Sequence, residues 1–229
     1  MVPPLKLLSS MATREMLAEI ALRYERDTAR AVAAEAAGGV EVARRLQGGE
    51  TADVVVLAAS AIDELTAAGH LLEGSRVDLV RSGIAIAVRA GSPEPDIATE
   101  AALRKAVLEA GTLSYSTGPS GVYLEGLFER WGILGQIRAR IIVPPPGVPV
   151  GSLVAQGAVG LGFQQQSELM HIAGITVIGP LPPEIQSLTM FAGAIGAACS
   201  DPAAARALLA FAASPAVADV RQRHGMAAP

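Results

Sequence analysis

Short apolar runs alternate along this chain with longer stretches in which apolar residues recur every third or fourth position. Residues 5–9 form such a run, and residues 13–26 form the helical stretch that follows it. The run at 53–58 is the most continuous of them, which is typical of a strand buried on both faces. Alternation of this kind predicts an α/β protein with mostly parallel sheets flanked by helices.

The other expected elements follow the same pattern, with glycine, proline or small polar residues at their ends. The expected strands also cover residues 31–35, 83–89, 111–116, 140–143, 159–163 and 175–178, and an apolar stretch covers 188–198. The expected helices also cover residues 40–47, 60–68, 99–110, 122–131, 151–156, 202–213 and 215–224. Ser60, Asp201 and Ser214 stand where helix caps are expected, whereas the cap of the helix at 99–110 stays open.

No internal repeat and no long linker divides the sequence. Its 229 residues and 51% hydrophobic content are enough for one large domain or for two lobes. We expect two lobes that share the chain, with residues 1–82 and 188–229 in lobe I and residues 83–187 in lobe II. The chain is then expected to cross between the lobes near Ser82 and again near Ser187.

Composition argues against several classes of function. The formal net charge of -4 disfavours a general nucleic-acid binder, whose phosphate contacts need a basic surface. Aromatic residues make up 3% of the chain, too few for the stacking platforms of a sugar site or a single-stranded nucleic-acid site. Cys199 is the single cysteine, and His70, His171 and His224 show no paired spacing, so we expect no metal site and no cofactor.

No window of the sequence reaches the roughly 20 apolar residues of a membrane span, so membrane insertion is not expected. The first ten residues, with one lysine and two adjacent leucines, are too short for the apolar core of a secretory signal. The expected compartment is the periplasm if a signal segment has been removed, and the cytoplasm if the chain is complete as it stands.

Small polar residues recur where helices are expected to begin, directly after strands. A helix N-terminus presents unpaired N–H groups and about half a positive charge, so several of them together can bind an anion without lysine or arginine. Ordinary helix capping is the alternative explanation for any one of these loops. The candidate ligand-binding residues are Ser9, Ser10, Met11, Ala12, Gly38, Gly39, Ser60, Ser116, Thr117, Ser120, Gly121, Gly147, Val148, Gln164 and Gln165. Arg138 and Arg140 are reserve candidates for pairing with a carboxylate.

Two glycine-rich segments come near to known motifs without meeting them. Residues 118–122 fail the nucleophile-elbow pattern because Val122 stands where its last glycine is required, so Ser120 is a better anion ligand than nucleophile. Residues 157–162 carry glycines in the wrong order for a dinucleotide loop and lead into a strand. Nucleotide binding is therefore not supported.

Taken together, several segments resemble the molybdate-type extracellular solute-binding family. They are residues 7–13, 38–39, 52–59, 120–123 and 161–168, of which Ala52-Asp-Val-Val-Val-Leu-Ala-Ala is the most specific. The resemblance covers essentially the whole chain and implies a type 2 periplasmic-binding fold, in which two lobes joined by two crossing strands hold a ligand at helix N-termini. It also implies a small anionic ligand and an ABC-transporter permease as a candidate partner.

The chain departs from that family at residues expected to surround a tetrahedral oxyanion. Molybdate binders of the family use a serine in each of the first two loops and a tyrosine shortly after the Leu-Gly strand. This chain has Met11-Ala12, Gly38-Gly39-Val40 and Gln165 at those places. We therefore expect a binding protein for a small anion that is an organic carboxylate rather than molybdate.

An isomerase is the alternative from a different class of function, because aconitate isomerase is similar to the same family and acts on a tricarboxylate. Proton transfer beside a carboxylate needs a base within hydrogen-bond reach. Glu41, Glu168 and Glu184 lie near candidate loops, and the sequence singles out none of them as that base. A ligand sensor that works with a second protein is a third interpretation.

Overall fold

The computed structural model describes residues 2–145 and 147–229, so Met1 and Pro146 lie outside the described part. The chain folds into two compact units. Unit 1 comprises Met1–Ser82 and Met190–Pro229, and unit 2 comprises Gly83–Thr189. The chain passes from unit 1 into unit 2 within strand β4 and returns within strand β8.

The sheet of unit 1 has the strand order β2-β1-β3-β8. Its strands are β1 (Leu5–Ser10), β2 (Val32–Ala37), β3 (Val54–Ala58) and β8 (Leu188–Ile195). β1 pairs in parallel with both β2 and β3, and β8 runs antiparallel to β3. The helices are α1 (Arg14–Thr28), α2 (Gly39–Gln47), α3 (Ala59–Ala67), α9 (Pro202–Ala213) and α10 (Ala218–Arg223). The 3-10 turns Met11–Thr13 and Pro215–Val217 precede α1 and α10.

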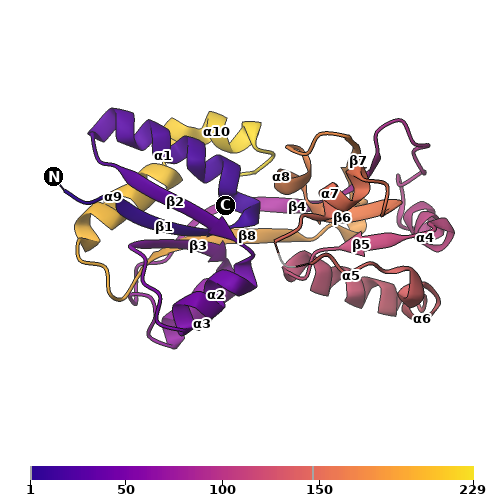
Figure 1. Cartoon of the computed structure of the whole chain (residues 1–229), viewed down its shortest axis with the longest axis horizontal. Coiled ribbons are helices and arrows are strands. Elements are labelled where there is room, and N and C mark those ends of the chain that lie inside the picture. Colours follow the sequence, from indigo (N-terminus) through magenta and orange to yellow (C-terminus); the bar gives the residue numbers. More distant parts are fainter. Residues whose placement is uncertain (1, 146) are drawn as a thin grey trace. The chain divides into compact units, whose positions relative to one another are not determined.

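Helices cover both faces of this sheet (Figure 1). Because side chains alternate along a strand, Leu7, Val54 and Val56 pack with α1 and α9. Leu8 and Val55 point the other way and pack with α2 and α3. Burial on both faces explains why β3 is apolar at every position instead of alternating with polar residues.

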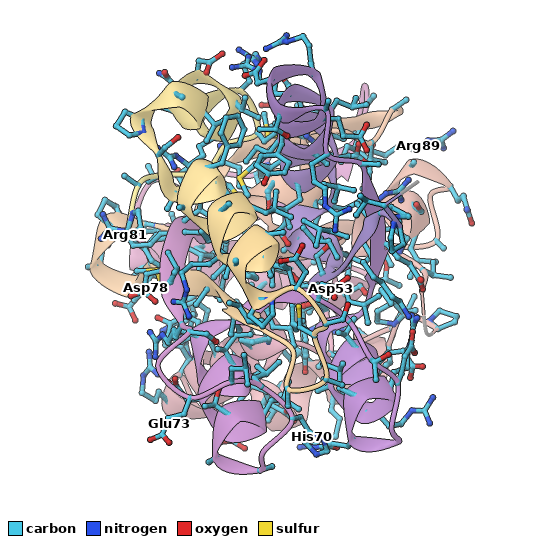
Figure 2. The ribbon with its side chains drawn as sticks, turned by 90° about the vertical axis from the view of Figure 1, so that its left-hand side faces the viewer. Asp53, His70, Glu73, Asp78, Arg81 and Arg89 are labelled. Atoms are coloured by element: carbon cyan, nitrogen blue, oxygen red, sulfur yellow. The ribbon has the colours of Figure 1, made fainter. Side chains whose placement is uncertain are left out.

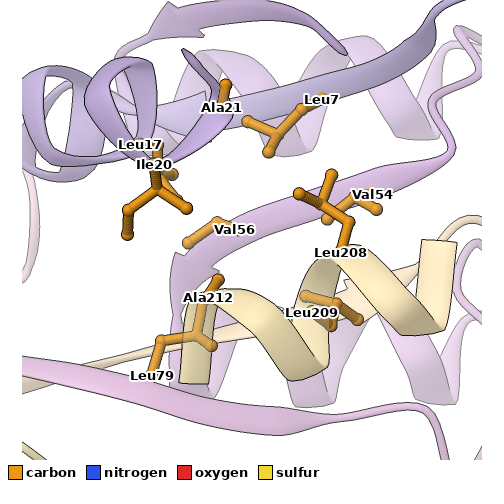
Figure 3. Close-up of a pocket in the computed structure, with 10 residues that line it drawn as sticks. All are labelled: Leu7, Leu17, Ile20, Ala21, Val54, Val56, Leu79, Leu208, Leu209 and Ala212. Carbon is orange, nitrogen blue, oxygen red and sulfur yellow. The ribbon is translucent and has the colours of Figure 1, made fainter. Parts of the chain in front are cut away.

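A small void lies within the core of unit 1, between α1, α9 and the strands (Figure 3). Its volume is about 10 Å³, and its lining includes Leu17 and Ile20 of α1 and Leu209 of α9. A space of this size holds roughly one water molecule, and a water needs polar partners that these aliphatic side chains lack. The void is therefore a packing defect and not a ligand site.

Polar side chains tie strand ends together in unit 1, and two of them, Asp53 and Arg81, are labelled in Figure 2. The carboxylate of Asp53 accepts a hydrogen bond of 2.8 Å from the backbone N–H of Lys6. Arg81 exchanges two backbone hydrogen bonds of 2.9 Å with Ala227, and its Nε donates to the carbonyl of Ala228 at 2.8 Å. The C-terminal residues are thereby held against β4.

The strands of unit 2 continue the same eight-stranded sheet in the order β7-β4-β6-β5. These strands are β4 (Val77–Arg89), β5 (Leu113–Tyr115), β6 (Leu161–Gln165) and β7 (Ile175–Pro180). The helices of unit 2 are α4 (Glu100–Glu109), α5 (Pro119–Arg130), α6 (Leu134–Ile137), α7 (Val150–Ala155) and α8 (Gln166–Leu169), with 3-10 turns at Arg138–Arg140 and Pro183–Ile185. Phe128 and Phe163 lie at the centre of its larger core, which α4, α5 and α6 cover.

The expectation of a mostly parallel sheet is wrong for unit 2. β5 and β6 are parallel, but β4 runs antiparallel to both β6 and β7. An apolar run predicts a buried strand without predicting its direction, because direction depends on the path of the chain between strands. The same long strand extends back to Val77, beyond the expected start at Gly83.

Several expected boundaries also need correction. α3 has Ala58 at its N-cap, so Ser60 lies inside the first turn and is not the cap. α5 begins at Pro119, because proline at the first helical position has the right φ and needs no donor there. Residues 119–121 are therefore helix and not loop. The expected strand at 140–143 is reduced to a single bridge between Leu113 and Ile141.

The last two expected caps differ in kind, which gives a testable difference in stability. Asp201 caps α9, because its carboxylate accepts a hydrogen bond of 3.0 Å from the N–H of Ala204. The hydroxyl of Ser214 instead donates to the carbonyl of Phe211 at 2.7 Å. We expect Asp201→Ala to lower the free energy of unfolding by about 1 kcal/mol and Asp201→Asn to retain most of it, as measured by urea denaturation. Equal losses in both variants would contradict capping by this side chain.

The helix at 99–110 has a resolved N-cap as well. The Oγ1 of Thr99 accepts a hydrogen bond of 3.2 Å from the N–H of Ala102, which settles the cap that the sequence left open.

Within residues 2–145 and 147–229, no single helix is long and apolar enough to cross a membrane. The helix pair Pro202–Ala213 and Pro215–Arg223 together has the length and apolar composition of a membrane span, but a bend of 59° separates its two members. Leu208, Leu209 and Val220 of this pair are buried in the core of unit 1.

Candidate functional site

The carboxyl ends of β1, β2 and β3 lie along one edge of the sheet in unit 1, because these strands are parallel. The register places Ser10 beside Ala37 of β2, and Ser9 beside Val56 of β3. A helical turn begins directly after each strand end. We call residues 9–13, 38–39 and 58–60, where three helical N-termini meet, the unit 1 edge.

The strand order gives a further reason to expect a ligand at the unit 1 edge. β1 lies between β2 and β3, so α1 leads to one side of β1 and α2 leads back across to the other. Open α/β sheets bind ligands beyond the carboxyl ends of their strands, at the point where the strand order reverses. Ser10 of β1 and Ala58 of β3 flank this point.

Hydroxyl groups gather at the end of β1. Ser9 is 2% exposed. The Oγ of Ser10 lies 3.4 Å from the Oγ1 of Thr13, which also donates to the Ser10 carbonyl at 3.2 Å. A Cβ atom on Gly39 would lie 3.8 Å from the Cβ of Ser10, so the start of α2 lies against the end of β1. Thr13 is an addition to the expected residues, because its contact with Ser10 depends on the turn at 11–13.

The remaining expected residues of the unit 1 edge differ in exposure. Ala12 is buried and belongs to the hydrophobic core, while Met11 is half-buried. Gly38 and Ser60 are exposed. Ser9 and Ser10 are therefore the side chains that this edge offers as hydroxyl donors, together with backbone N–H groups of the helix starts, while Thr13 is fully buried and donates to the Ser10 carbonyl.

Unit 2 has an edge of its own where the parallel strands β5 and β6 end. Tyr115 of β5 lies beside Phe163 of β6, so Ser116 follows one strand where Gln164 continues the other. The hydroxyls of Ser116 and Ser120 are 2.9 Å apart, which joins the loop to the first turn of α5. We call residues 115–121 the unit 2 edge.

Gly121 is required for the structure of this edge. A Cβ atom at residue 121 would lie 1.6 Å from the carbonyl oxygen of Ser116, a distance that no pair of non-bonded atoms can occupy. The same test at Gly126, in the middle of α5, finds no atom within 4 Å. Gly121 therefore allows the loop to close onto the helix.

The two expected glutamine ligands already use their donors within unit 2. The Nε2 of Gln164 donates to Glu168 at 2.6 Å, and its Oε1 accepts from the N–H of Gly151 at 3.3 Å. The Nε2 of Gln165 donates to the Oγ1 of Thr189 at 2.9 Å. Both glutamines are buried, so each acts in the packing of this unit.

Glu168 is the most perturbed carboxyl group of unit 2 among the described residues. Burial raises its pKa to about 7, and the hydrogen bond from Gln164 opposes this rise. Glu41 and Glu184, the other two candidate bases, are exposed and already bind the guanidinium of Arg44 and the backbone N–H of Glu100. A carboxyl group with a pKa near neutrality can both accept and release a proton, which a general base requires.

The remaining expected residues lie in the turn before α7. Gly147 has a φ of 77°, and the N–H of Val148 donates to the carbonyl of Pro145 at 3.0 Å. This positive φ explains the glycine, because other residues rarely adopt it. The turn leads into Pro149, the N-cap of α7.

The two reserve arginines have different surroundings. Arg140 donates to the backbone carbonyls of Leu108 and Ala110, so it serves the fold. Arg138 is exposed and lines a hollow beside the unit 2 edge. Arg138 is therefore the arginine that remains available for a ligand.

Metal-ligating side chains do not cluster in the part of the chain that the structure describes. His224 lies 3.1 Å from the carboxylate of Glu19, within a group of ion pairs that joins α10 to α1. His70 follows the end of α3 (Figure 2).

Two comparisons with known proteins, one with a family model and one with a curated relative, each cover almost the whole chain. The model of a family described as bacterial extracellular solute-binding protein matches residues 5–227. The chain is also 39% identical to aconitate isomerase from Pseudomonas sp., over 98% of this chain and 88% of that relative.

Solved structures give the same fold at lower identity. The periplasmic molybdate-binding protein of Azotobacter vinelandii matches with a TM-score of 0.81 and 19% identity, over 98% of this chain and 99% of that one. The sulfate-binding protein of Mycobacterium tuberculosis matches with a TM-score of 0.79 and 14% identity, over 98% of this chain and 86% of that one. The predicted α/β periplasmic-binding fold is thereby confirmed.

Proposed function

Because this chain belongs to the family of bacterial extracellular solute-binding proteins, we propose that it binds a small organic anion with two or three carboxylate groups. The observation that carries the proposal is the 39% identity to aconitate isomerase over 98% of the chain, since that relative is named for a tricarboxylate. The relatives named for molybdate and sulfate are 19% and 14% identical, and at that level they show the fold alone.

The donors at the two edges suit carboxylate oxygens. The unit 1 edge offers the hydroxyls of Ser9 and Ser10, and the unit 2 edge offers those of Ser116 and Thr117. Hydroxyl and backbone N–H groups donate to an anion, and the positive end of a helix dipole favours negative charge. Each edge, taken by itself, therefore offers neutral donors that suit an acidic ligand.

Calorimetry with the whole chain tests the proposal. We expect heat of binding with trans-aconitate, cis-aconitate or citrate, and none with molybdate or sulfate at the same concentration. A ligand that binds the folded state must also raise the melting temperature, which gives a second readout. Binding of molybdate or sulfate without binding of any of the three carboxylates would contradict the proposal.

Ser120→Ala is expected to weaken carboxylate binding by about 1 to 3 kcal/mol, because it leaves the hydroxyl of Ser116 without its partner at 2.9 Å and removes one donor from the edge. Ser92→Ala, at an exposed turn of the same unit, is the matched control. Calorimetric titration of both variants measures the difference. Equal affinities would remove Ser120 from the site.

Isomerisation of bound aconitate is the second candidate function, and the raised pKa of Glu168 favours it. In such a reaction a base removes a proton from the methylene carbon, the charge spreads over the allylic system and a carboxylate, and the proton returns to the former vinylic carbon. A base with a pKa near 7 suits this transfer at neutral pH. Conversion of trans- to cis-aconitate followed by ultraviolet absorbance, and lost in Glu168→Gln while binding persists, would support the enzyme. Binding without turnover would support a solute-binding protein.

The family also suggests the setting in which the protein works. We propose a periplasmic location and an ABC-transporter permease as partner for a binding protein of this type. Fractionation of cells followed by detection of the chain tests the location, and recovery in the cytoplasm would contradict it.

A further inference from the structure

A hollow of about 370 Å³ lies in unit 2 beside the N-terminus of α5. The start of this helix forms one wall, and the segment at 138–143 contributes another. Two hydrogen bonds of 2.7 Å hold that segment against β5, from the N–H of Ile142 to the Leu113 carbonyl and from the Ser114 hydroxyl to the Ile142 carbonyl. The volume falls in the range of roughly 300 to 1,000 Å³ that small-molecule sites occupy.

The hollow contains both donors and a positive charge. Ser116 and Thr117 of the unit 2 edge line it, as does Arg138. Among the described residues, the guanidinium of Arg138 makes no hydrogen bond and no ion pair. A guanidinium offers several donors in a planar fork that matches a carboxylate, so this side chain is ready to bind one.

Tyr115 also lines the hollow, and the charges of Glu125 and Arg138 both act on its hydroxyl. Burial raises the pKa of its hydroxyl, the carboxylate of Glu125 adds to the rise, and the guanidinium of Arg138 opposes it. Both charged groups therefore act on the same part of the hollow. Glu125 repels an anion close to its own side chain, whereas Arg138 attracts one.

Aliphatic side chains form the rest of the lining. Val122 and Val143 are 71% and 67% exposed, which is unusual for valine, and Leu134 and Ile141 also line the hollow. An inorganic oxyanion has no apolar surface to bury against these walls. The carbon skeleton of an organic acid has such surface, and its burial is favourable.

We propose that Arg138 binds one carboxylate of an organic ligand whose other carboxylate is held by the hydroxyl and N–H groups of the unit 2 edge. This inference rests on the proposed function: if the protein binds a polycarboxylate, Arg138 is the residue that makes the site selective for one. The recognition is that of a bidentate guanidinium–carboxylate pair, so lysine at residue 138 replaces the charge without the geometry.

Calorimetry of three variants against trans-aconitate and citrate tests this proposal. Arg138→Met is expected to weaken binding by about tenfold to a hundredfold, and Arg138→Lys by an intermediate factor. The control is Arg206→Met, which removes an equal charge from an exposed position of α9 in unit 1 and is expected to change affinity less than about twofold. Because Arg138 is exposed and supports no other residue, both of its variants should melt at the temperature of the unsubstituted protein. If Arg138→Met melts at a lower temperature, the affinity of Arg138→Lys is the one compared with that of the unsubstituted protein.

The outcomes separate this inference from the function on which it rests. If the unsubstituted protein binds polycarboxylates and Arg138→Met binds them equally well, the assignment of Arg138 is overturned while the function stands. If Arg138→Met weakens the binding of sulfate and leaves the binding of the carboxylates unchanged, the organic ligand class is wrong. If the unsubstituted protein binds no carboxylate at all, the proposed function fails first.

Discussion

Gly121→Ala is expected to disrupt the N-terminus of α5 and to abolish ligand binding by unit 2. The new Cβ atom would lie 1.6 Å from the carbonyl oxygen of Ser116, and that oxygen belongs to the backbone, so no side-chain rotation relieves the clash. The loop must move away from the helix, which separates the hydroxyls of Ser116 and Ser120. We expect the free energy of unfolding to fall by about 3 kcal/mol or more.

Gly126→Ala provides the matched control, since it makes the same chemical change five residues later in the same helix. Nothing lies within 4 Å of a Cβ atom there, so alanine should stabilise the helix by about 0.5 to 1 kcal/mol. Urea denaturation measures both changes, and calorimetry measures binding. A Gly121→Ala protein as stable as Gly126→Ala would show that the loop does not pack as described.

Glu168→Gln is expected to stabilise the protein at pH 8 and to leave its stability at pH 4.5 nearly unchanged. Burial raises the pKa of Glu168 from 4.5 to about 7 in the folded state. Between these two values the folded protein keeps a proton that the unfolded chain has released. The free energy of unfolding therefore falls as the pH rises through this window, by an amount on the order of 3 kcal/mol when complete.

Glutamine removes this loss because it has no charge to desolvate, and its carbonyl can still accept the hydrogen bond from Gln164. Glu129→Gln, on the exposed surface of α5, is the control and should follow the pH dependence of the unsubstituted protein. Denaturation in urea at pH 4.5, 6, 7 and 8 provides the comparison. If the difference between Glu168→Gln and the unsubstituted protein does not grow with pH, the carboxyl group is not desolvated in the folded state.

Much of the candidate site follows from local sequence. The serines at the end of β1 and the glycine and serine residues at the start of α5 stand where strands give way to helices, and hydrophobic periodicity locates such transitions. Errors arise where local rules compete: Ser60 has the chemistry of a cap, but α3 begins one residue earlier with Ala58 as its N-cap. Local sequence also could not show that the side-chain amides of Gln164 and Gln165 donate to Glu168 and Thr189.

The sequence by itself determined the α/β class, the buried strand β3 and the helix starts that follow parallel strands, because these depend on the spacing of apolar residues along a short segment. The tertiary structure decided the antiparallel course of β4, the contact that makes Gly121 indispensable, the desolvation of Glu168 and the presence of Arg138 and Ser116 in the lining of one hollow. Each of these depends on groups brought together by the path of the chain, and a pKa or a steric clash is set by such neighbours and not by spacing in sequence.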